Sequence, residues 1–190
     1  MSLSELAGDY RRHGRSLRNP ALWALATYRF GVWSNRLSLP GIRWLTSKIY
    51  GGLSFGVELS SGIWLHRETQ IGRELHLVHS GNIKIHPRVR LGDRVGIMHD
   101  VTIGAGMDRV GVPVIGDDVF IGTGARVLGP VVIGNGARIA ANSLVLSDVP
   151  AGATAVGVPA RILRYTGREP SPPGAVAPRS LEGSVTDDGE

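Results

Sequence analysis

Aliphatic residues recur at every sixth position in the stretch VIGDDVFIGTGARVLGPVVIGNGARIAANSLVLSDV. A second set, four residues later and with the same interval, carries mostly small or slim side chains. The two sets are Ile115, Ile121, Val127, Ile133, Ile139 and Val145, and Val119, Ala125, Val131, Ala137, Ser143 and Val149. This interval fits neither the helical period of about 3.6 residues nor simple strand alternation, and it is typical of a hexapeptide parallel β-helix.

Such a period predicts an all-β core in which three hexapeptides make one triangular coil of about eighteen residues. The aliphatic residue of each hexapeptide points inward, and the small residue lies near a corner. A single coil cannot bury its own apolar wall, so we expect roughly four to five stacked coils. A β-sandwich of short strands is the alternative, but sandwiches do not keep one phase over so many steps.

The same interval extends upstream, with two interruptions. Two extra residues fall within 78–84, because Leu77 and Ile85 are eight residues apart. Farther on, Gly104–Pro113 is polar and rich in glycine. This second segment is either a loop that leaves the coil or a degraded rung.

An N-terminal helix is predicted over Asn19–Leu37, with Asn19 as its cap and Pro20 in its first turn. One face of this helix carries Leu22, Ala26, Phe30, Trp33 and Leu37. We favour packing of this stripe on the β-helix or on a neighbouring subunit. Because four arginines precede the helix, a weak membrane contact through this basic helical segment is the alternative.

The predicted domain organisation has three parts: an N-terminal helical segment (1–55), the β-helix with its cap (56–165) and a tail (166–190). The sequence GVPARILR (Gly157–Arg164) would cover the last coil, whose strand edges are otherwise open. The tail is rich in proline, glycine and charged residues, and we expect it to be disordered.

Composition narrows the possible chemistry. The chain has no cysteine, which excludes disulfides, thiolate metal sites and a cysteine nucleophile. Its formal net charge of +5 comes from residues 1–50, which hold eight Lys/Arg and two Asp/Glu. No nucleic-acid-binding motif accompanies these charges, so no nucleic-acid partner is expected. Since neither a signal peptide nor a membrane span is recognisable, we expect a cytoplasmic protein.

From Gly56 to Leu163, the repeat and its GVPARI ending resemble the left-handed β-helix acyltransferases, most closely the serine acetyltransferases and related O-acetyltransferases of polysaccharide pathways. The resemblance implies a left-handed coil and acetyl-CoA as co-substrate, with no metal required. It also implies a homotrimer or a pair of trimers, with active sites between subunits. Some hexapeptide-repeat proteins are not enzymes, so repeat architecture alone does not establish the chemistry.

The stretch LHRETQIGRELHLVHSGNIKI resembles the part of serine acetyltransferases that carries the catalytic histidine, which falls on His79. A histidine suits this role because its pKa lies near neutrality, where a general base works best. Family members place aspartates at positions that here hold Val78 and Trp64. A second functional histidine of the family corresponds to Val112.

Coil arithmetic adds a second catalytic candidate, His99, twenty residues after His79, which is one coil plus the two extra residues. His99 lines the cleft or serves as a turn residue. The same spacing pairs His66 with His86, and these two, like His76, are expected at the surface or in structural roles. Stacked histidines with few nearby carboxylates are weak evidence for a metal site.

By the same resemblance, coenzyme A would lie along the C-terminal coils in a groove between two subunits. The matching small residues permit close backbone approach, although coil geometry alone also explains them, and the matching arginines suit phosphate. These positions are Gly122, Gly124, Ala125, Ala140, Ala141, Arg161 and Arg164.

The predicted function is therefore acetyl-CoA-dependent O-acetylation of a small hydroxyl acceptor, L-serine or similar, with a histidine base. One alternative is an O-acetyltransferase that acts on a saccharide of a surface polysaccharide pathway. Another is a catalytically silent trimeric scaffold.

Overall fold

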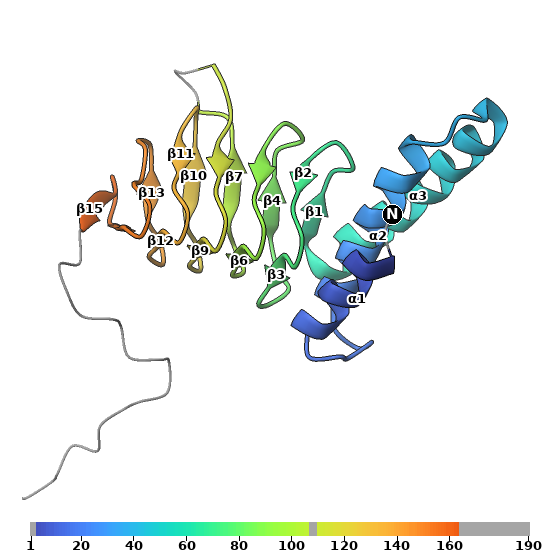
Figure 1. Cartoon of the computed structure of the whole chain (residues 1–190), viewed down its shortest axis with the longest axis horizontal. Helices are drawn as coiled ribbons and strands as arrows, with labels where there is room; N and C mark the ends of the chain where they lie inside the picture. Colours follow the sequence, from blue (N-terminus) through green and yellow to red (C-terminus); the bar gives the residue numbers. More distant parts are fainter. Residues whose placement is uncertain (1–2, 107–109, 164–190) are drawn as a thin grey trace, which may run out of the picture.

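The computed structural model describes residues 3–106 and 110–163, and it shows three helices stacked on one end of a β-solenoid (Figure 1). The strands follow one another around three sheets, and strands of neighbouring coils pair in parallel. This architecture confirms the β-helix predicted from the period of six. The predicted disordered tail, 166–190, lies outside the described residues.

The helices are α1 (Leu3–Arg12), α2 (Pro20–Asn35) and α3 (Pro40–Ser61). Helix α3 ends at Gly62, which has a left-handed φ of 66°, and the first strand begins at Ile63. The division expected after residue 55 therefore falls inside α3, and the change from helix to strand comes at Gly62.

Each side of the solenoid is one sheet. The first sheet contains β1 (Ile63–Leu65), β4 (Ile83–Ile85), β7 (Thr102–Gly104), β10 (Arg126–Leu128) and β13 (Leu144–Val145). The second contains β2 (Gln70–Ile71), β5 (Arg90–Leu91), β8 (Val114–Ile115) and β11 (Val132–Ile133). The third contains β3 (His76–Leu77), β6 (Gly96–Ile97), β9 (Phe120–Ile121), β12 (Arg138–Ile139), β14 (Thr154–Val156) and β15 (Arg161–Leu163).

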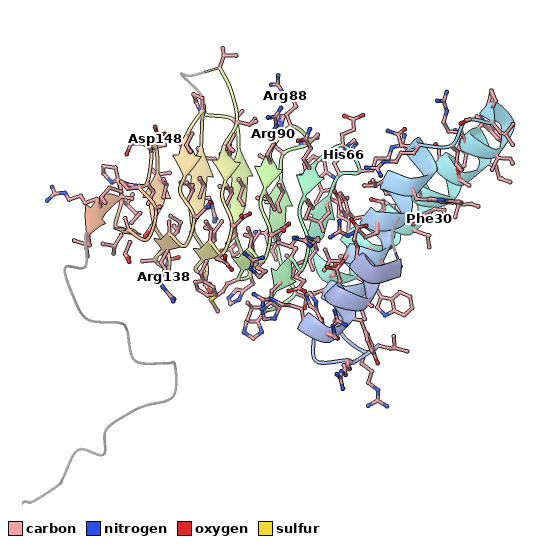
Figure 2. All side chains as sticks on the ribbon, viewed as in Figure 1. Phe30, His66, Arg88, Arg90, Arg138 and Asp148 are labelled. Carbon is pink, nitrogen blue, oxygen red and sulfur yellow. The ribbon has the colours of Figure 1, made fainter. Side chains whose placement is uncertain are left out.

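The core is a set of columns in which each inward side chain stacks on its equivalent one coil away. In the third sheet, Leu77 aligns with Ile97, Ile97 with Ile121, and Ile121 with Ile139. All four are essentially inaccessible to solvent. Both sets of residues picked out by the period of six are likewise buried. Figure 2 shows the opposite orientation, with Arg88, Arg90 and Arg138 pointing away from the solenoid.

The two interruptions of the repeat are accommodated differently. Ile85 aligns with Ile103, the regular offset of eighteen, whereas Leu65 aligns with Ile85, an offset of twenty. Ile103 aligns with Val127, an offset of twenty-four. The described residues between β7 and β8, 105–106 and 110–113, form no strand, and β8 pairs directly with both β5 and β11, so no extra rung separates these coils.

At the far end, β15 pairs antiparallel with β14 and covers the last parallel strand of the third sheet. The amide of Ala160 also donates to the Leu144 carbonyl of the final coil. This arrangement matches the cap predicted for the segment that begins at Gly157.

Helix α2 begins as predicted, with the Asn19 side chain accepting a hydrogen bond from the Ala21 amide at 3.0 Å. The predicted apolar stripe is only partly right: Leu22 is buried, but Trp33 is 37 % exposed. The buried face is wider because α2 packs against both α3 and β1. Gly31 makes this packing possible, since a Cβ there would lie 2.4 Å from the Tyr50 ring.

Polar side chains of the helices satisfy backbone groups of the first coil. The Tyr28 hydroxyl donates to the Thr69 carbonyl at 2.7 Å and accepts from the Ile71 amide at 3.3 Å. Arg29 donates to the carbonyls of Ile71 and Gly72. The helices therefore replace the coil that is missing at this end, where edge groups would otherwise lie unpaired.

Two further side chains complete this replacement. The Tyr50 hydroxyl donates to the Leu65 carbonyl at 3.4 Å and accepts from the Arg67 amide at 3.1 Å. The carboxylate of Asp9 pairs with Arg29 at 3.1 Å, and both side chains are almost fully buried. The ion pair thus holds α1 on the same arginine that contacts the first coil.

Replacing Tyr28 with Phe should lower the free energy of unfolding by about 1–3 kcal/mol, because a buried amide and carbonyl lose their partner. Tyr10→Phe is the matched control, since the Tyr10 hydroxyl makes only an exposed hydrogen bond to the Arg15 carbonyl. Urea unfolding followed by circular dichroism measures both. Equal stability of the two variants would contradict the capping role of Tyr28.

Candidate active site

The two catalytic candidates lie together at one corner of the solenoid. His79 follows β3 and His99 follows β6, and the pairing of Leu77 with Ile97 places them one above the other. Their ring centroids are 5.7 Å apart, with the ring planes inclined at 60°. His79 is exposed and His99 is half-buried. The spacing of twenty residues thus correctly predicted that these rings are neighbours.

The same corner continues along the third sheet with smaller side chains. The position two residues past each aligned core residue is Thr123 in the third coil and Ala141 in the fourth. We call these four residues, His79, His99, Thr123 and Ala141, the histidine corner. Its N-terminal end carries two imidazoles, and its C-terminal end carries two small side chains.

The extra residues after β3 fold onto the turn that carries His99. Gly81 has a φ of 125°, and its carbonyl accepts from the Asp100 amide at 2.9 Å. The side-chain amide of Asn82 donates to the Asp100 carboxylate at 2.6 Å. Asp100 also lies 3.8 Å from the Arg126 guanidinium. The two-residue insertion is therefore an ordered part of the corner beside His79.

A histidine that sequence reasoning missed supports the strand before His79. The Leu77 amide donates to His13 Nε2 at 3.1 Å, while His13 Nδ1 donates to the Asp9 carbonyl at 2.8 Å. This pattern requires a neutral imidazole with its proton on Nδ1. Strand β3 is the first of the third sheet, so His13 takes the place of a neighbouring strand. The two positions are 64 residues apart, and no periodic pattern connects them.

The other histidines have structural environments, as expected. His66 Nδ1 accepts from the Glu68 amide, and His86 Nδ1 accepts from the Arg88 amide, both at 3.2 Å. Each ring therefore closes the turn that follows its own strand. His76 packs edge-on against His13, with ring centroids 5.2 Å apart.

The small residues proposed for coenzyme A binding lie on the third and fourth coils, but the coil itself requires two of them. A Cβ on Gly122 would lie 2.7 Å from the Ala141 amide nitrogen of the next coil. Gly124 has a left-handed φ of 72°. The side chain of Ala125 is fully buried in the core, so only its backbone faces this region.

The remaining proposed positions are accessible where the structure describes them. Ala140 is half-buried, Ala141 is exposed, and Arg161 projects from β15 with an exposed side chain. Arg164 lies outside the described residues. The accessible positions are thus the half-buried Gly124 and Ala140 and the exposed Ala141 and Arg161.

The two positions to which the resemblance assigns aspartates are apolar here. Val78 is half-buried, and its amide donates to the Ile97 carbonyl. Trp64 lies in β1, opposite Lys84. Val112, at the position that the resemblance assigns to a second functional histidine, packs against the hydrophobic core. The two carboxylates that the resemblance implies are therefore not present at these positions.

A hollow of about 610 Å³ lies elsewhere, between α2 and the first coil. Its lining includes Tyr28, Arg29 and Thr69, the groups that close the open end of the solenoid. We assign this hollow to the junction between helices and coil rather than to the active site.

Two features are missing from residues 3–106 and 110–163. In this part of the chain, no group of three or more His, Cys, Asp or Glu side chains is arranged to hold a metal ion. Likewise, none of the described helices combines the length and apolar character needed to cross a membrane.

Comparison with known proteins supports a transferase relationship. Residues 113–147 match the family model described as bacterial transferase hexapeptide (six repeats). A serine acetyltransferase of Staphylococcus xylosus is 42 % identical over 110 residues, which cover 57 % of this chain and 51 % of that protein. The chain therefore spans about half the length of the curated relative that it matches.

Solved structures give the same relationship across most of the chain. A serine acetyltransferase in complex with CoA superposes with a TM-score of 0.71 and 28 % identity, covering 84 % of this chain and 68 % of that one. Soybean serine acetyltransferase complexed with serine gives 0.73 and 29 %, with the same coverage. The Neisseria gonorrhoeae enzyme in complex with serine gives 0.68 and 28 %, covering 85 % and 66 %.

The environment of His76 generates a pH prediction. Burial lowers its pKa below the usual value of 6.5, and the positive charge of the nearby Arg12 acts in the same direction. The unfolded chain therefore binds a proton more readily than the folded chain, so stability should fall as the pH drops below about 6.5.

Melting temperatures measured between about pH 7.5 and about pH 5 test this expectation. His76→Gln should weaken the pH dependence, whereas His66→Gln, at a partly exposed turn, should leave it nearly unchanged. An identical pH dependence in the wild type and His76→Gln would contradict the assignment.

Proposed function

We propose that this chain, whose repeats and fold are similar to those of serine acetyltransferases, transfers the acetyl group of acetyl-CoA to a hydroxyl of a small acceptor. L-Serine is the first candidate acceptor, because structural neighbours are complexes with serine. The observation that carries the proposal is the histidine corner, where an exposed imidazole and small residues share one edge of the solenoid.

In this proposal, His79 is the general base. Its imidazole accepts the proton of the acceptor hydroxyl while the hydroxyl oxygen attacks the thioester carbonyl. The carbon–sulfur bond then breaks, and the proton passes from His79 to the departing thiolate, which leaves as the free thiol. No covalent enzyme intermediate is needed, in keeping with a chain that has no cysteine.

His99 is the second member of the proposed site. Its half-buried ring lies 5.7 Å from His79 and separates that residue from the small side chains of the later coils. This placement suits a residue that lines the cleft between acceptor and thioester. The backbone around it is fixed, since the Gly124 amide donates to the His99 carbonyl at 3.1 Å.

The C-terminal half of the corner is the proposed binding surface for the pantetheine arm. Support comes from the homologue in complex with CoA and from the low profile of Ala140 and Ala141. Arg161 is a cation on the same sheet that suits a phosphate of the nucleotide. We propose Arg164 for the same role by resemblance.

An alternative acceptor is a saccharide hydroxyl. The ammonium group of an amino acid is best held by a carboxylate, and the two matching aspartate positions hold Val78 and Trp64. A sugar offers no such charge, so the absence of these aspartates favours it. The non-enzymatic alternative is a catalytically silent scaffold.

The assembly that we propose is a homotrimer or a pair of trimers, by resemblance to enzymes with sites between subunits. Exposure of His79 on an open corner supports this, because a neighbouring subunit would then supply the missing wall. Light scattering of the purified chain checks the mass. A cytoplasmic location, like the absence of a nucleic-acid partner, stays a prediction.

The function is tested by incubating the protein with acetyl-CoA and, separately, serine, homoserine and a panel of sugars, while free thiol is followed with a chromogenic reagent. Acceptor-dependent thiol release is the expected result, and the accepted compound decides between amino acid and saccharide. A protein that binds CoA but releases no thiol with any acceptor counts against the proposed panel of acceptors. Lack of CoA binding would support the scaffold.

Replacing His79 with Asn should lower kcat by roughly 10²–10⁴-fold, the usual effect of removing a general base. CoA affinity, measured by calorimetry, should change little, because the proposed groove lies on the later coils.

His99→Asn should have a smaller effect on kcat, and His86→Asn, on a different corner, should have almost none. Near-normal turnover of the His79 variant together with an inactive His99 variant would reverse the two roles. Full activity of both would show that the base is not a histidine of this corner.

A further inference from the structure

The proposed general base, His79, follows a strand that has a neighbouring coil on one side only. Among the described residues, β3 is the end strand of the third sheet, and β6 is its neighbour. The amides of His76 and Val78 donate to carbonyls of that next coil. Because successive amides of a strand point to opposite sides, the Leu77 amide points away from β6, two residues before His79.

His13 occupies this open side of β3. Its Nε2 accepts from the Leu77 amide at 3.1 Å, and its Nδ1 donates to the Asp9 carbonyl at 2.8 Å. The His13 side chain is only 4 % exposed, and its ring packs edge-on against His76. Both ring nitrogens are therefore engaged, and the imidazole is held between the end of α1 and the strand that leads to His79.

Helix α1 is itself anchored, so His13 is attached to a fixed support. The Asp9 carboxylate pairs with the Arg29 side chain at 3.1 Å, and both side chains are almost fully buried. Arg29 donates in turn to the carbonyls of Ile71 and Gly72 in the first coil. Figure 1 shows α1 at the same end of the solenoid as β3. A continuous set of contacts thus runs from the first coil through α1 and back to β3.

The backbone around His99 is supported differently, because coils lie on both sides of it. Its strand, β6, pairs with β3 on one side and with β9 on the other. The Met98 amide donates to the Ile121 carbonyl, and the His99 carbonyl accepts from the Gly124 amide. Of the two imidazoles of the histidine corner, His79 is therefore the one whose strand depends on a helix for support.

We propose that His13 is a positioning residue for His79: its hydrogen bond to the Leu77 amide fixes the end of β3 and thereby the direction in which the His79 imidazole projects. A general base must lie within hydrogen-bond reach of the proton that it accepts. A displacement of about 1 Å can lower turnover by about 10²-fold. Because His13 is buried behind the strand, it acts through His79 and not on the acceptor. This inference rests on the proposed acetyl transfer, but part of its test is independent of turnover.

Three replacements of His13 separate its two hydrogen bonds. His13→Gln places a side-chain oxygen near the position of Nε2, so it still accepts from the Leu77 amide. The Asn side chain reaches only to the position of Nδ1, so His13→Asn keeps a donor for the Asp9 carbonyl and loses the strand. His13→Leu keeps much of the volume and neither hydrogen bond. Tyr28→Phe is the matched control, because it weakens the closure of the first coil at the second sheet, away from β3.

Turnover is measured by thiol release with the acceptor that the wild type accepts, well below the melting temperature of each variant. His13→Leu and His13→Asn should lower kcat by about 10–100-fold. The KM for acetyl-CoA and the number of CoA sites found by calorimetry should stay nearly unchanged, because the proposed groove lies on the later coils. His13→Gln should restore most of the lost kcat. Tyr28→Phe should keep nearly the wild-type kcat, although it lowers the melting temperature.

The environment of the His79 ring is measured independently of turnover, by NMR of protein with isotope-labelled histidine rings. Loss of a signal in His79→Asn assigns the His79 resonance. This resonance should shift in His13→Leu and His13→Asn and stay near its wild-type position in His13→Gln and Tyr28→Phe. Since Gln also removes the His13 ring, a shift caused only by loss of an aromatic neighbour would appear in all three His13 variants.

Three results would overturn the proposal. One is normal kcat with an unshifted His79 resonance in His13→Leu and His13→Asn, and another is the same shift in all three His13 variants. The third is an equal loss of kcat in Tyr28→Phe, which would show a general effect of a weaker cap. If His13→Leu does not fold, the comparison of His13→Asn with His13→Gln decides. If the wild type releases no thiol with any acceptor, the proposed acetyl transfer fails, and the NMR comparison alone decides whether His13 positions His79.

Discussion

The whole molecule depends on how the open edge of its first coil is closed. A parallel solenoid satisfies backbone groups only through the coils above and below, so its first coil has half of its partners missing. Here Tyr28, Arg29, Tyr50 and His13 supply those partners from three different places in the helical segment. Because Asp9 holds Arg29 in turn, α1 and α2 are fixed on the same edge. The helices and the solenoid therefore form one folding unit rather than two linked ones.

The solenoid could be predicted from the sequence because every coil repeats the same demand for an inward aliphatic residue. Ile121 and Ile139, two of the aliphatic residues found by the period of six, are indeed buried in the core. The closing contacts could not be predicted, since His13 and Leu77 are far apart in sequence and meet only after folding. The buried face of α2 was misjudged for a related reason. This helix packs against α3 and β1 at once, so a single stripe could not describe it.

For the candidate site, coil arithmetic was sufficient to bring His79 and His99 together, although nothing in the spacing revealed which of them is exposed. The resemblance identified Gly122 and Gly124, but the structure shows that coil stacking and backbone conformation already require both. Small residues on a solenoid are therefore weak evidence for a ligand on their own. The histidines are more informative, because no stacking rule demands an imidazole at an exposed corner.

The side chains of the histidine corner are also regularly spaced, one for each coil. Coils stack at the strand spacing of about 4.8 Å, and the imidazoles occupy the first two coils while the low side chains occupy the next two. An elongated molecule bound along this edge would therefore span a whole number of coils. Duplication of a coil between His99 and Thr123 would lengthen the edge by one strand spacing and leave the side chains at both ends unchanged. Insertion of whole coils would therefore change the distance between the two ends of the histidine corner in fixed steps, while the residues at each end stay the same.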